Sequence, residues 1–420
     1  MPHATPSENA PLQRRRILVV DDDPFYTQVM QTILTAEGAI VTLENDSRKA
    51  MVRIEEEHPE VILLDVMMPE MDGMELCRLI RSRPELHDRV VIFVSAKAYE
   101  FDRKRAQSLG ADGYFTKPIE AERFIADLGR ILVDAIDVQF WGVRGTLPMS
   151  GPQTLKYGGF TNCITAQFPK GDFFIFDGGT GIKPLADDLL RRKKLPIEAR
   201  ILISHPHWDH INGLPFFVPL YMQGNEFEIC GAYHGDTTMR ELISNQMDGP
   251  YFPVKIKAFG ARVYFRDLRE GSFALTPEIT LRTLLLSHPG ACLGYRLEYR
   301  NRSLCYVTDN ELYPPETPHY SESYRNKLIH FVQGTDVLIT DATYADHEYR
   351  PKMGWGHSNV SQVVSLAHDA GVKNLFLHHH DPDQSDDAID AKLAHAQSLL
   401  RELQSATHCH APKEKDVFTF

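Results

Sequence analysis

In the first third of the chain, short apolar runs alternate with stretches whose apolar residues fall on one helical face. The helical stretches include 24–38 and 72–82, and the apolar runs are ILVVDD (17–22), VILLDV (61–66), VVIFVSA (90–96) and DGYFTKP (112–118). Strands that are apolar along their whole length are typical of a parallel sheet with helices on both faces. The pattern therefore predicts a doubly wound α/β domain, whose reactive groups lie beyond the carboxyl ends of the strands.

After Asp137 the pattern changes to many short strands and fewer helices. The apolar runs predict strands near 138–143, 163–168, 173–179, 200–205, 227–233, 261–267, 281–287, 294–300, 303–309, 336–342 and 374–380, and helices near 183–193, 239–246, 360–371 and 388–403. Histidines cluster at several of the strand ends. Many strands with helices outside them predict sheets sandwiched between helix layers.

A chain of 420 residues is too long for one ordinary core, so we expect two domains. We expect a flexible lead-in over 1–14, a first domain over 15–135 and a second over 136–420. A hydrophobic fraction of 43% and a charged fraction of 24% are typical of globular proteins.

The net charge of −12 argues against nucleic-acid backbone as the main ligand, without excluding it. The basic run at Arg191, Arg192, Lys193 and Lys194 is interpreted as a solvated helix end. The six cysteines form no C-x-x-C pair, the N-terminus has no apolar signal segment, and no apolar run approaches the ~20 residues of a membrane helix. We therefore expect a cytoplasmic protein with no membrane partner.

Acidic and hydroxyl side chains follow the strands of the first domain. Asp21 and Asp22 close the first run, Asp65 the second, Ser95 the third and Lys117 the fourth. Carboxylates suit a hard cation such as Mg²⁺, and an ammonium group would neutralise an incoming phosphoryl group. Asp65 is thus a candidate nucleophile for an aspartyl phosphate.

The strings ILVVDDDP, VILLDVMMPEMDG, FVSA and GYFTKP resemble the receiver domain of bacterial response regulators. The resemblance implies a (βα)5 fold in which a sensor histidine kinase phosphorylates Asp65. The pocket that it implies uses Asp21, Asp22 and the Met67 backbone carbonyl for Mg²⁺, Lys117 for the phosphoryl group, and Ser95 and Tyr114 as switch residues.

The second domain contains ILISHPHWDHINGLPFF, in which His205, His207, Asp209 and His210 follow an apolar strand. A turn of this spacing can point the first two histidines at one metal ion and Asp209 with His210 at a neighbouring one. Imidazole and carboxylate together suit Zn²⁺, Mn²⁺ or iron.

Two ions ~3.5–4 Å apart need further donors, with a carboxylate bridging them. The candidates again follow predicted strands: His288, Asp309 and the group His378, His379 and His380.

The strings WGVRGTLP, KYGGFTNC, FDGGTG, SHPHWDHINGLPFF, SHPGACLGYRLE, VTDNE, GWGHSN and HHDPDQSD resemble the metallo-β-lactamase superfamily, closest to its branch of ribonuclease Z-like and cyclic phosphodiesterases. The resemblance implies an αββα sandwich with two divalent ions. It assigns His205, His207 and His288 to the first ion, Asp209, His210 and His379 to the second, with His378 as the alternative to His379, and Asp309 as the bridge.

The same resemblance suggests roles for three residues outside the ligand set. His357 in GWGHSN would contact the scissile phosphate or help the leaving group depart. Asp177 in FDGGTG would orient the ligand loop. Phe160 stands where the relatives usually have Asn, which predicts a different substrate preference if the position faces substrate.

These observations predict a phosphorylation-regulated response regulator whose output domain is a dinuclear phosphodiesterase. A second copy of the chain, forming a homodimer, is a possible partner. Zinc is the favoured ion, with manganese and iron as alternatives, and Asp209, Asp309 and His357 are the expected catalytic residues. A phosphodiester or a small cyclic nucleotide-like molecule is the expected substrate. The alternatives are a lactonase, thioesterase or β-lactamase on the same fold, a di-iron redox or oxygen sensor, and a non-catalytic output module.

Overall fold

The structure is a computed structural model that describes residues 11–97, 99–192 and 196–420. Most of the expected lead-in, residues 1–10, therefore lies outside the described residues, as do Lys193 and Lys194 of the basic run. The chain forms two compact units, Met1–Ile136 with Phe168–Asp172, and Asp137–Gln167 with Phe173–Phe420. Each unit is described by itself below.

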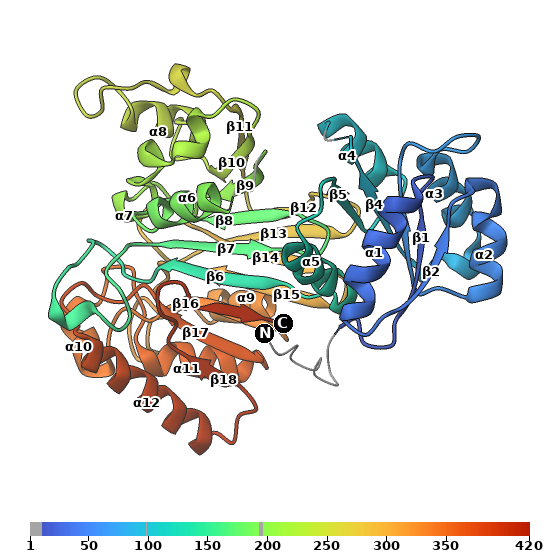
Figure 1. Ribbon diagram of the computed structural model, residues 1–420. Coiled ribbons are helices and arrows are strands. Elements are labelled where there is room, and N and C mark those ends of the chain that lie inside the picture. The colour runs from blue at the N-terminus through green and yellow to red at the C-terminus, as the bar shows by residue number, and fades with distance from the viewer. Residues whose placement is uncertain (1–10, 98, 193–195) are drawn as a thin grey trace. The chain divides into compact units, whose positions relative to one another are not determined.

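The first unit contains a parallel sheet of order β2-β1-β3-β4-β5, with helices on both faces (Figure 1). Its strands are β1 (Arg16–Val20), β2 (Ile40–Glu44), β3 (Val61–Leu64), β4 (Val90–Ser95) and β5 (Gly113–Thr116), and its helices are α1 (Pro24–Ala36), α2 (Ala50–Glu57), α3 (Gly73–Ser82), α4 (Glu100–Ser108) and α5 (Ala121–Val133). The predicted doubly wound (βα)5 arrangement is confirmed. The strand order brings the carboxyl ends of β1, β3, β4 and β5 to one edge.

The second unit contains two seven-stranded sheets, of order β11-β10-β9-β8-β7-β6-β19 and β12-β13-β14-β15-β16-β17-β18. The strands of the first are β6 (Asp137–Gly142), β7 (Cys163–Gln167), β8 (Phe173–Phe176), β9 (Glu198–Leu202), β10 (Glu226–Ala232), β11 (Arg262–Leu268) and β19 (Val417–Thr419). Those of the second are β12 (Gly271–Ala274), β13 (Ile279–Leu285), β14 (Leu293–Tyr299), β15 (Arg302–Val307), β16 (Val337–Asp341), β17 (Asn374–His378) and β18 (His408–His410).

The two sheets pack face to face. Phe140 of β6 stacks on Phe376 of β17 with ring centroids 5.3 Å apart, and Phe176 of β8 meets Tyr306 of β15 at 5.2 Å. Aromatic pairs at these distances fill the layer between sheets. Buried aromatic side chains therefore join the two sheets.

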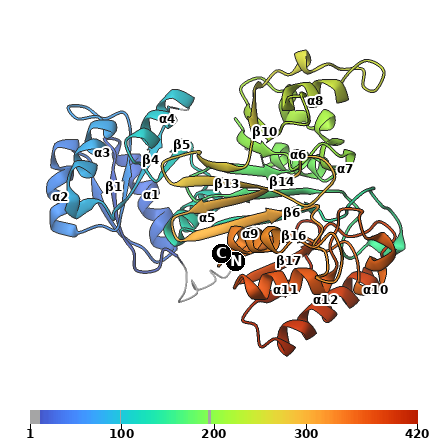
Figure 2. The same ribbon diagram turned by 180° about the vertical axis from the view of Figure 1, so that it is seen from behind.

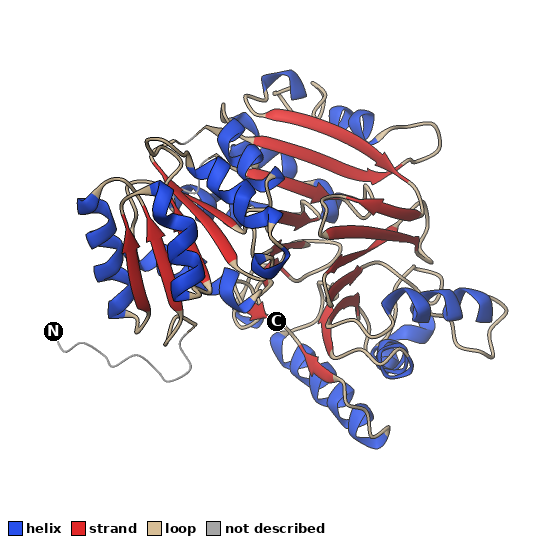
Figure 3. Ribbon diagram, turned by 90° about the vertical axis from the view of Figure 1, so that its right-hand side faces the viewer, coloured by secondary structure: helices blue, strands red, loops and turns tan. Residues whose placement is uncertain are grey.

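Helices cover the outer face of each sheet (Figures 1 and 2). They are α6 (Ile182–Arg191), α7 (Trp208–Ile211) and α8 (Met239–Gln246) along the first half, and α9 (Glu322–Val332), α10 (Asp346–Tyr349), α11 (Val360–Asp369) and α12 (Asp386–Glu402) along the second. Separate apolar clusters lie beneath them, one around Leu185, Ile201 and Ile243 and another around Leu328, Val364 and Leu377. The predicted αββα layering is thus confirmed (Figure 3).

Among the described residues, no helix is both long and apolar enough to cross a bilayer.

Candidate phosphoacceptor pocket and metal centre

The strand ends of the first unit form an acidic pocket around one lysine. The Lys117 ammonium lies 2.6 Å from Asp21 Oδ2 and 2.7 Å from Asp65 Oδ1. Both carboxylates are buried, whereas Asp22 is exposed. The structure therefore brings the predicted nucleophile and the predicted phosphoryl-binding lysine into direct contact.

The electrostatics of this pocket follow from its burial. Burial raises the pKa of Asp65, an effect that Lys117 opposes. Burial also disfavours the charged ammonium, but the two carboxylates outweigh it and raise the pKa of Lys117. The ion pairs thus keep the lysine cationic, as a phosphoryl-binding group requires.

The other predicted pocket residues surround this ion pair. The Met67 backbone N–H donates to Asp65 Oδ2, and Ser95 is fully buried at the end of β4. The Tyr114 hydroxyl donates to the Lys97 carbonyl at 2.8 Å. Tyr26, which was not predicted, places its ring 4.0 Å from the Lys117 ammonium.

In the second unit, side chains from four strand ends converge on one place. The motif residues His205 to His210 follow β9, His288 follows β13, Asp309 follows β15 and His379 follows β17. Donor atoms of His205, His207, His288 and Asp309 all lie within 4.8 Å of one another, and so do those of Asp209, His210 and His379. The structure brings together all seven residues that were predicted from the sequence to be metal ligands.

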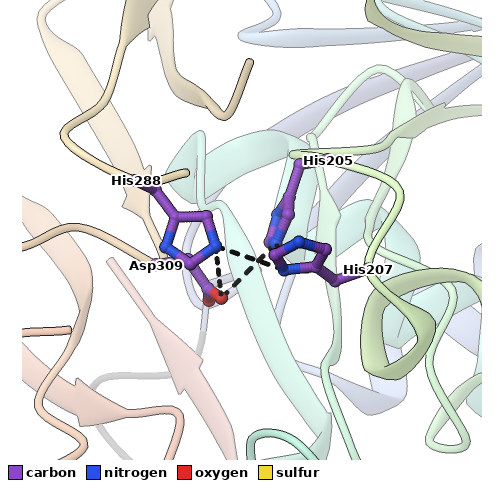
Figure 4. A group of neighbouring side chains, drawn as sticks. All are labelled: His205, His207, His288 and Asp309. Atoms are coloured by element: carbon purple, nitrogen blue, oxygen red, sulfur yellow. Dashed lines mark hydrogen bonds and ion pairs between the residues drawn. The ribbon is translucent and has the colours of Figure 1, made fainter. Parts of the chain in front are cut away.

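The first group has three imidazoles around one carboxylate oxygen (Figure 4). His205 Nε2 lies 2.8 Å from His207 Nδ1, and His288 Nε2 lies 3.2 Å from the same atom. Asp309 Oδ2 is 3.5 Å from His205 Nε2 and 3.7 Å from His288 Nε2. His207 is the exposed member of the group, so the group opens to solvent on its side.

The second group uses the other oxygen of the same aspartate. Asp309 Oδ1 lies 3.1 Å from His379 Nε2 and 3.3 Å from His210 Nε2. Asp209 Oδ2 lies 3.2 Å from His210 Nε2 and 3.1 Å from His379 Nε2. Asp309 therefore offers one carboxylate oxygen to each group.

The chemistry of these donors fits divalent cations. Imidazole nitrogens lie 2.8–3.2 Å from one another in the first group, and imidazole nitrogens lie 3.1–3.7 Å from carboxylate oxygens across both groups. Burial and the neighbouring His210 lower the pKa of His205 well below its usual value, and a neutral imidazole is the ligating form. Burial disfavours the Asp309 carboxylate, but the surrounding imidazoles hold its pKa well below the usual range. The fold and this cluster together indicate divalent metal binding.

Asp177 orients one of the imidazoles from behind, as the sequence suggested. Its Oδ2 lies 2.7 Å from His210 Nδ1 and accepts hydrogen bonds from the hydroxyls of Ser204 at 2.9 Å and Tyr306 at 2.7 Å. With Nδ1 engaged, His210 can turn only Nε2 toward the cluster.

His357 lies beside both groups and is held by a carboxylate that was not predicted. Its Nδ1 donates to Asp341 Oδ2 at 2.8 Å, and its ring stacks on His379 with centroids 4.9 Å apart. Burial disfavours the protonated ring, but Asp341 outweighs it and raises the pKa of His357 to about 9. The Asp341 carboxylate therefore favours the protonated form of His357.

Thr343 links this pair to the cluster. The Thr343 hydroxyl donates to Asp341 Oδ1 at 2.6 Å and accepts from His379 Nδ1, which lies 3.0 Å away. His379 Nε2 is thereby aimed at Asp209 and Asp309. Asp341 closes its strand as Asp309 does, so the same signal could have found it.

The neighbours of His379 point elsewhere. His378 Nε2 bonds to the Gly142 carbonyl at 3.0 Å, and His380 is fully buried outside the cluster. Side chains alternate across a strand, so adjacent histidines cannot all face one point. The position of the imidazoles favours His379 over His378 as the ligand.

Comparisons with known proteins assign the two units separately. Residues 17–128 match the response regulator receiver domain, and residues 174–380 match the beta-lactamase superfamily domain. The metallo-beta-lactamase fold protein YhfI from Bacillus subtilis is 16% identical, with a TM-score of 0.49, over 68% of this chain and 100% of its own. A diphosphatase from the PhnP family is 16% identical, with a TM-score of 0.46, over 68% of this chain and 98% of its own. The signal receiver domain of a histidine kinase from Syntrophus aciditrophicus is 31% identical, with a TM-score of 0.27, over 28% of this chain and 90% of its own.

Proposed function

We propose that this chain, whose residues match a response regulator receiver domain and a beta-lactamase superfamily domain, is a phosphorylation-regulated, dinuclear phosphodiesterase. The observation that carries the proposal is Asp309, whose two oxygens face two separate sets of imidazoles. A bridging carboxylate between two histidine-rich groups is what a pair of hydrolytic metal ions needs. The proposed domain limits are 15–135 and 136–420.

The proposed ligand assignment follows the two groups. His205, His207 and His288 would hold one divalent ion, Asp209, His210 and His379 would hold the other, and Asp309 would contribute an oxygen to each. Zinc is the ion that this mixture suits best, with manganese and iron as alternatives. When bound, the ions supply the charge that polarises a phosphoryl oxygen and lowers the pKa of water.

The protein side chains complete the proposed reaction. Asp209 and Asp309 fix the geometry of the imidazoles, and one of the two carboxylates accepts the proton of the attacking water. His357, hydrogen-bonded to Asp341, donates its Nε2 proton to the oxygen that leaves phosphorus. Without this proton donor the leaving oxygen would depart as an alkoxide, so His357 is expected to matter most for poor leaving groups.

The receiver supplies the proposed regulation. A sensor histidine kinase would phosphorylate Asp65. Asp21, Asp22 and the Met67 carbonyl would hold Mg²⁺, and Lys117, whose ammonium contacts Asp65, would contact the phosphoryl oxygens. The new group adds close to two negative charges, to which Ser95 and Tyr114 respond.

The test first measures the metal content and then compares hydrolysis of a phosphodiester with hydrolysis of a lactone and a thioester. Full-length protein loaded with Zn²⁺ or Mn²⁺ is expected to contain two ions per chain and to hydrolyse bis(p-nitrophenyl) phosphate in preference to a γ-lactone or a thioester. Asp309→Asn should lose metal and activity, whereas Asp187→Asn, which changes an exposed acid of α6, should keep both. Turnover of the lactone alone, or two bound ions without turnover of either ester, would overturn the proposal.

A further inference from the structure

Two of the three tryptophans lie on the surface next to the metal centre. Trp208 is 81% exposed and Trp355 is 62% exposed, whereas Trp141 is 3% exposed in the core. Trp208 stands between His207 and Asp209, and Trp355 stands two residues before His357. An exposed indole beside a candidate reactive centre offers a large flat surface on which a planar ligand can stack.

The backbone under each indole is fixed. Trp208 begins α7, and its carbonyl accepts from the Asn212 N–H at 2.7 Å. The loop of Trp355 is held from inside, because the N–H groups of Gly354 and Gly356 each donate to the buried Glu311 carboxylate at 2.8 Å. Exposure of these two rings is therefore not a consequence of a loosely held chain.

The same loops are bonded to the metal centre itself. His288 Nδ1 donates to the Gly356 carbonyl at 3.0 Å, one residue from Trp355. His207, the exposed histidine of the first group, directly precedes Trp208. The two exposed tryptophans are thus close in the sequence to residues of the centre, Trp208 beside the exposed His207 and Trp355 beside Gly356.

We propose that Trp208 and Trp355 determine specificity by stacking on a planar nucleobase of the substrate, a small nucleotide phosphodiester; this rests on the proposed function. Every nucleobase has a π-face that can stack on an aromatic side chain, whichever base it is. The net charge of −12 disfavours a long polyanionic strand, so a mononucleotide or dinucleotide fits better than a polynucleotide. An acyl chain would instead need a continuous aliphatic groove rather than two rings on separate loops.

The test uses substrates that share a leaving group and differ in the other ester. Metal-loaded full-length protein is assayed with thymidine 5′-(p-nitrophenyl phosphate), ethyl p-nitrophenyl phosphate and dodecyl p-nitrophenyl phosphate. The nucleoside ester should have the highest kcat/KM. Trp208→Ala and Trp355→Ala should each lower kcat/KM for it about 5- to 100-fold, mainly through KM, and change the ethyl ester less than about twofold.

Two controls separate stacking from folding. Trp208→Phe and Trp355→Phe keep a ring and should retain most of the preference. Tyr264→Ala removes a half-exposed aromatic ring from the edge strand β11 and should leave all three esters unchanged. Binding of AMP should quench tryptophan fluorescence in the wild type and not in the double Phe variant that keeps only the buried Trp141, provided that the variant still binds metal.

The outcomes distinguish the two proposals. Hydrolysis of the ethyl ester without any gain from the base, or equal losses on all esters in the Trp variants, would overturn the stacking proposal alone. A preference for the dodecyl ester would replace the base by an aliphatic chain. Hydrolysis of none of the three esters would overturn the phosphodiesterase assignment and the stacking proposal with it.

Discussion

Asp177 is not a predicted metal ligand, but it orients His210, which is one. Its carboxylate occupies His210 Nδ1 at 2.7 Å, so Nε2 faces the cluster. Asp177→Asn is expected to weaken metal affinity about 10- to 100-fold, the usual effect of losing such a partner. Competition with a chromophoric chelator measures this affinity. Equal affinities of Asp177→Asn and the exposed-site variant Asp187→Asn would contradict this role.

Lys392 gives a pH dependence of stability with a definite sign. It is fully buried, its ammonium donates to the carbonyls of Ala342 and Thr343, and burial lowers its pKa to about 7. The unfolded chain keeps this proton up to about pH 10.4, so between the two values the unfolded state binds more protons and stability rises with pH. Below about pH 7 Lys392 is protonated in both the folded and the unfolded state, so the buried charge lowers the free energy of unfolding by its full amount.

The variant Lys392→Met has no group that titrates there. The free energy of unfolding of the wild type relative to this variant should rise by on the order of 2 kcal/mol between about pH 7 and about pH 9.5. Urea unfolding at several pH values measures the difference. The partly exposed Lys183→Met should show no such trend against the wild type, and a flat difference for Lys392→Met would contradict the assignment.

At the residue scale, the sequence predicted the donors better than their supports. His205 to His210 could be assigned because the spacing within one turn is local. His379 could only be chosen over His378 by resemblance, because either can end the strand. Asp341, Thr343 and Glu311 were not predicted, since their roles depend on contacts between strands and loops that are distant in the chain.

At the scale of elements, the glycine loop before His357 positions a ligand. Gly354 and Gly356 both have φ of +89°, so an alanine at either is strained alike. A Cβ at Gly356 would lie 2.3 Å from His288 Nδ1, whereas one at Gly354 meets nothing within 4 Å. An alanine at Gly354 therefore serves as a control for the backbone strain that an alanine at Gly356 introduces.

Gly356→Ala should displace His288 and weaken metal affinity at least about tenfold, while Gly354→Ala should cost only about 1 kcal/mol of stability. Chelator competition and urea unfolding of both variants separate the two effects. Similar metal affinities in the two variants would show that the loop does not position His288.

Most elements followed from their apolar periodicity, and several whose residues were not located share a physical reason. The strands β2 and β12 lie at sheet edges with only partly buried side chains, and β18 and β19 have three residues each. Helix α9 buries few residues, among them Leu328 and Phe331, so its apolar stripe is weak. Elements that bury few side chains show little apolar periodicity in the sequence, and tertiary contacts decide how they pair.

At the scale of the molecule, phosphorylation of Asp65 is expected to change hydrolysis by the second domain. Beryllofluoride, which mimics the phosphoryl group, should change turnover of bis(p-nitrophenyl) phosphate in the wild type and leave Asp65→Ala unaffected. The variant still carries the complete metal centre, so it controls for direct effects of fluoride on the ions. Identical rates in wild type, variant and treated wild type would remove the regulatory link.

The predicted metal ligands are also divided between the two sheets of the second unit. His205 to His210 follow β9 of one sheet, whereas His288, Asp309 and His379 follow strands of the other. Bound ions should therefore stabilise this domain against unfolding. 1,10-Phenanthroline is expected to lower its Tm on the order of 10 °C, and the non-chelating 1,7 isomer should not. Calorimetry would contradict this if both isomers gave one Tm.

The order of the proposed ligands along the chain has a consequence for folding during synthesis. A nascent chain that stops before β17 contains the whole His205–His210 motif and both Asp309 oxygens, yet it lacks the imidazole that turns toward Asp209 and Asp309. The second group is therefore incomplete until the segment that carries His379 has been made.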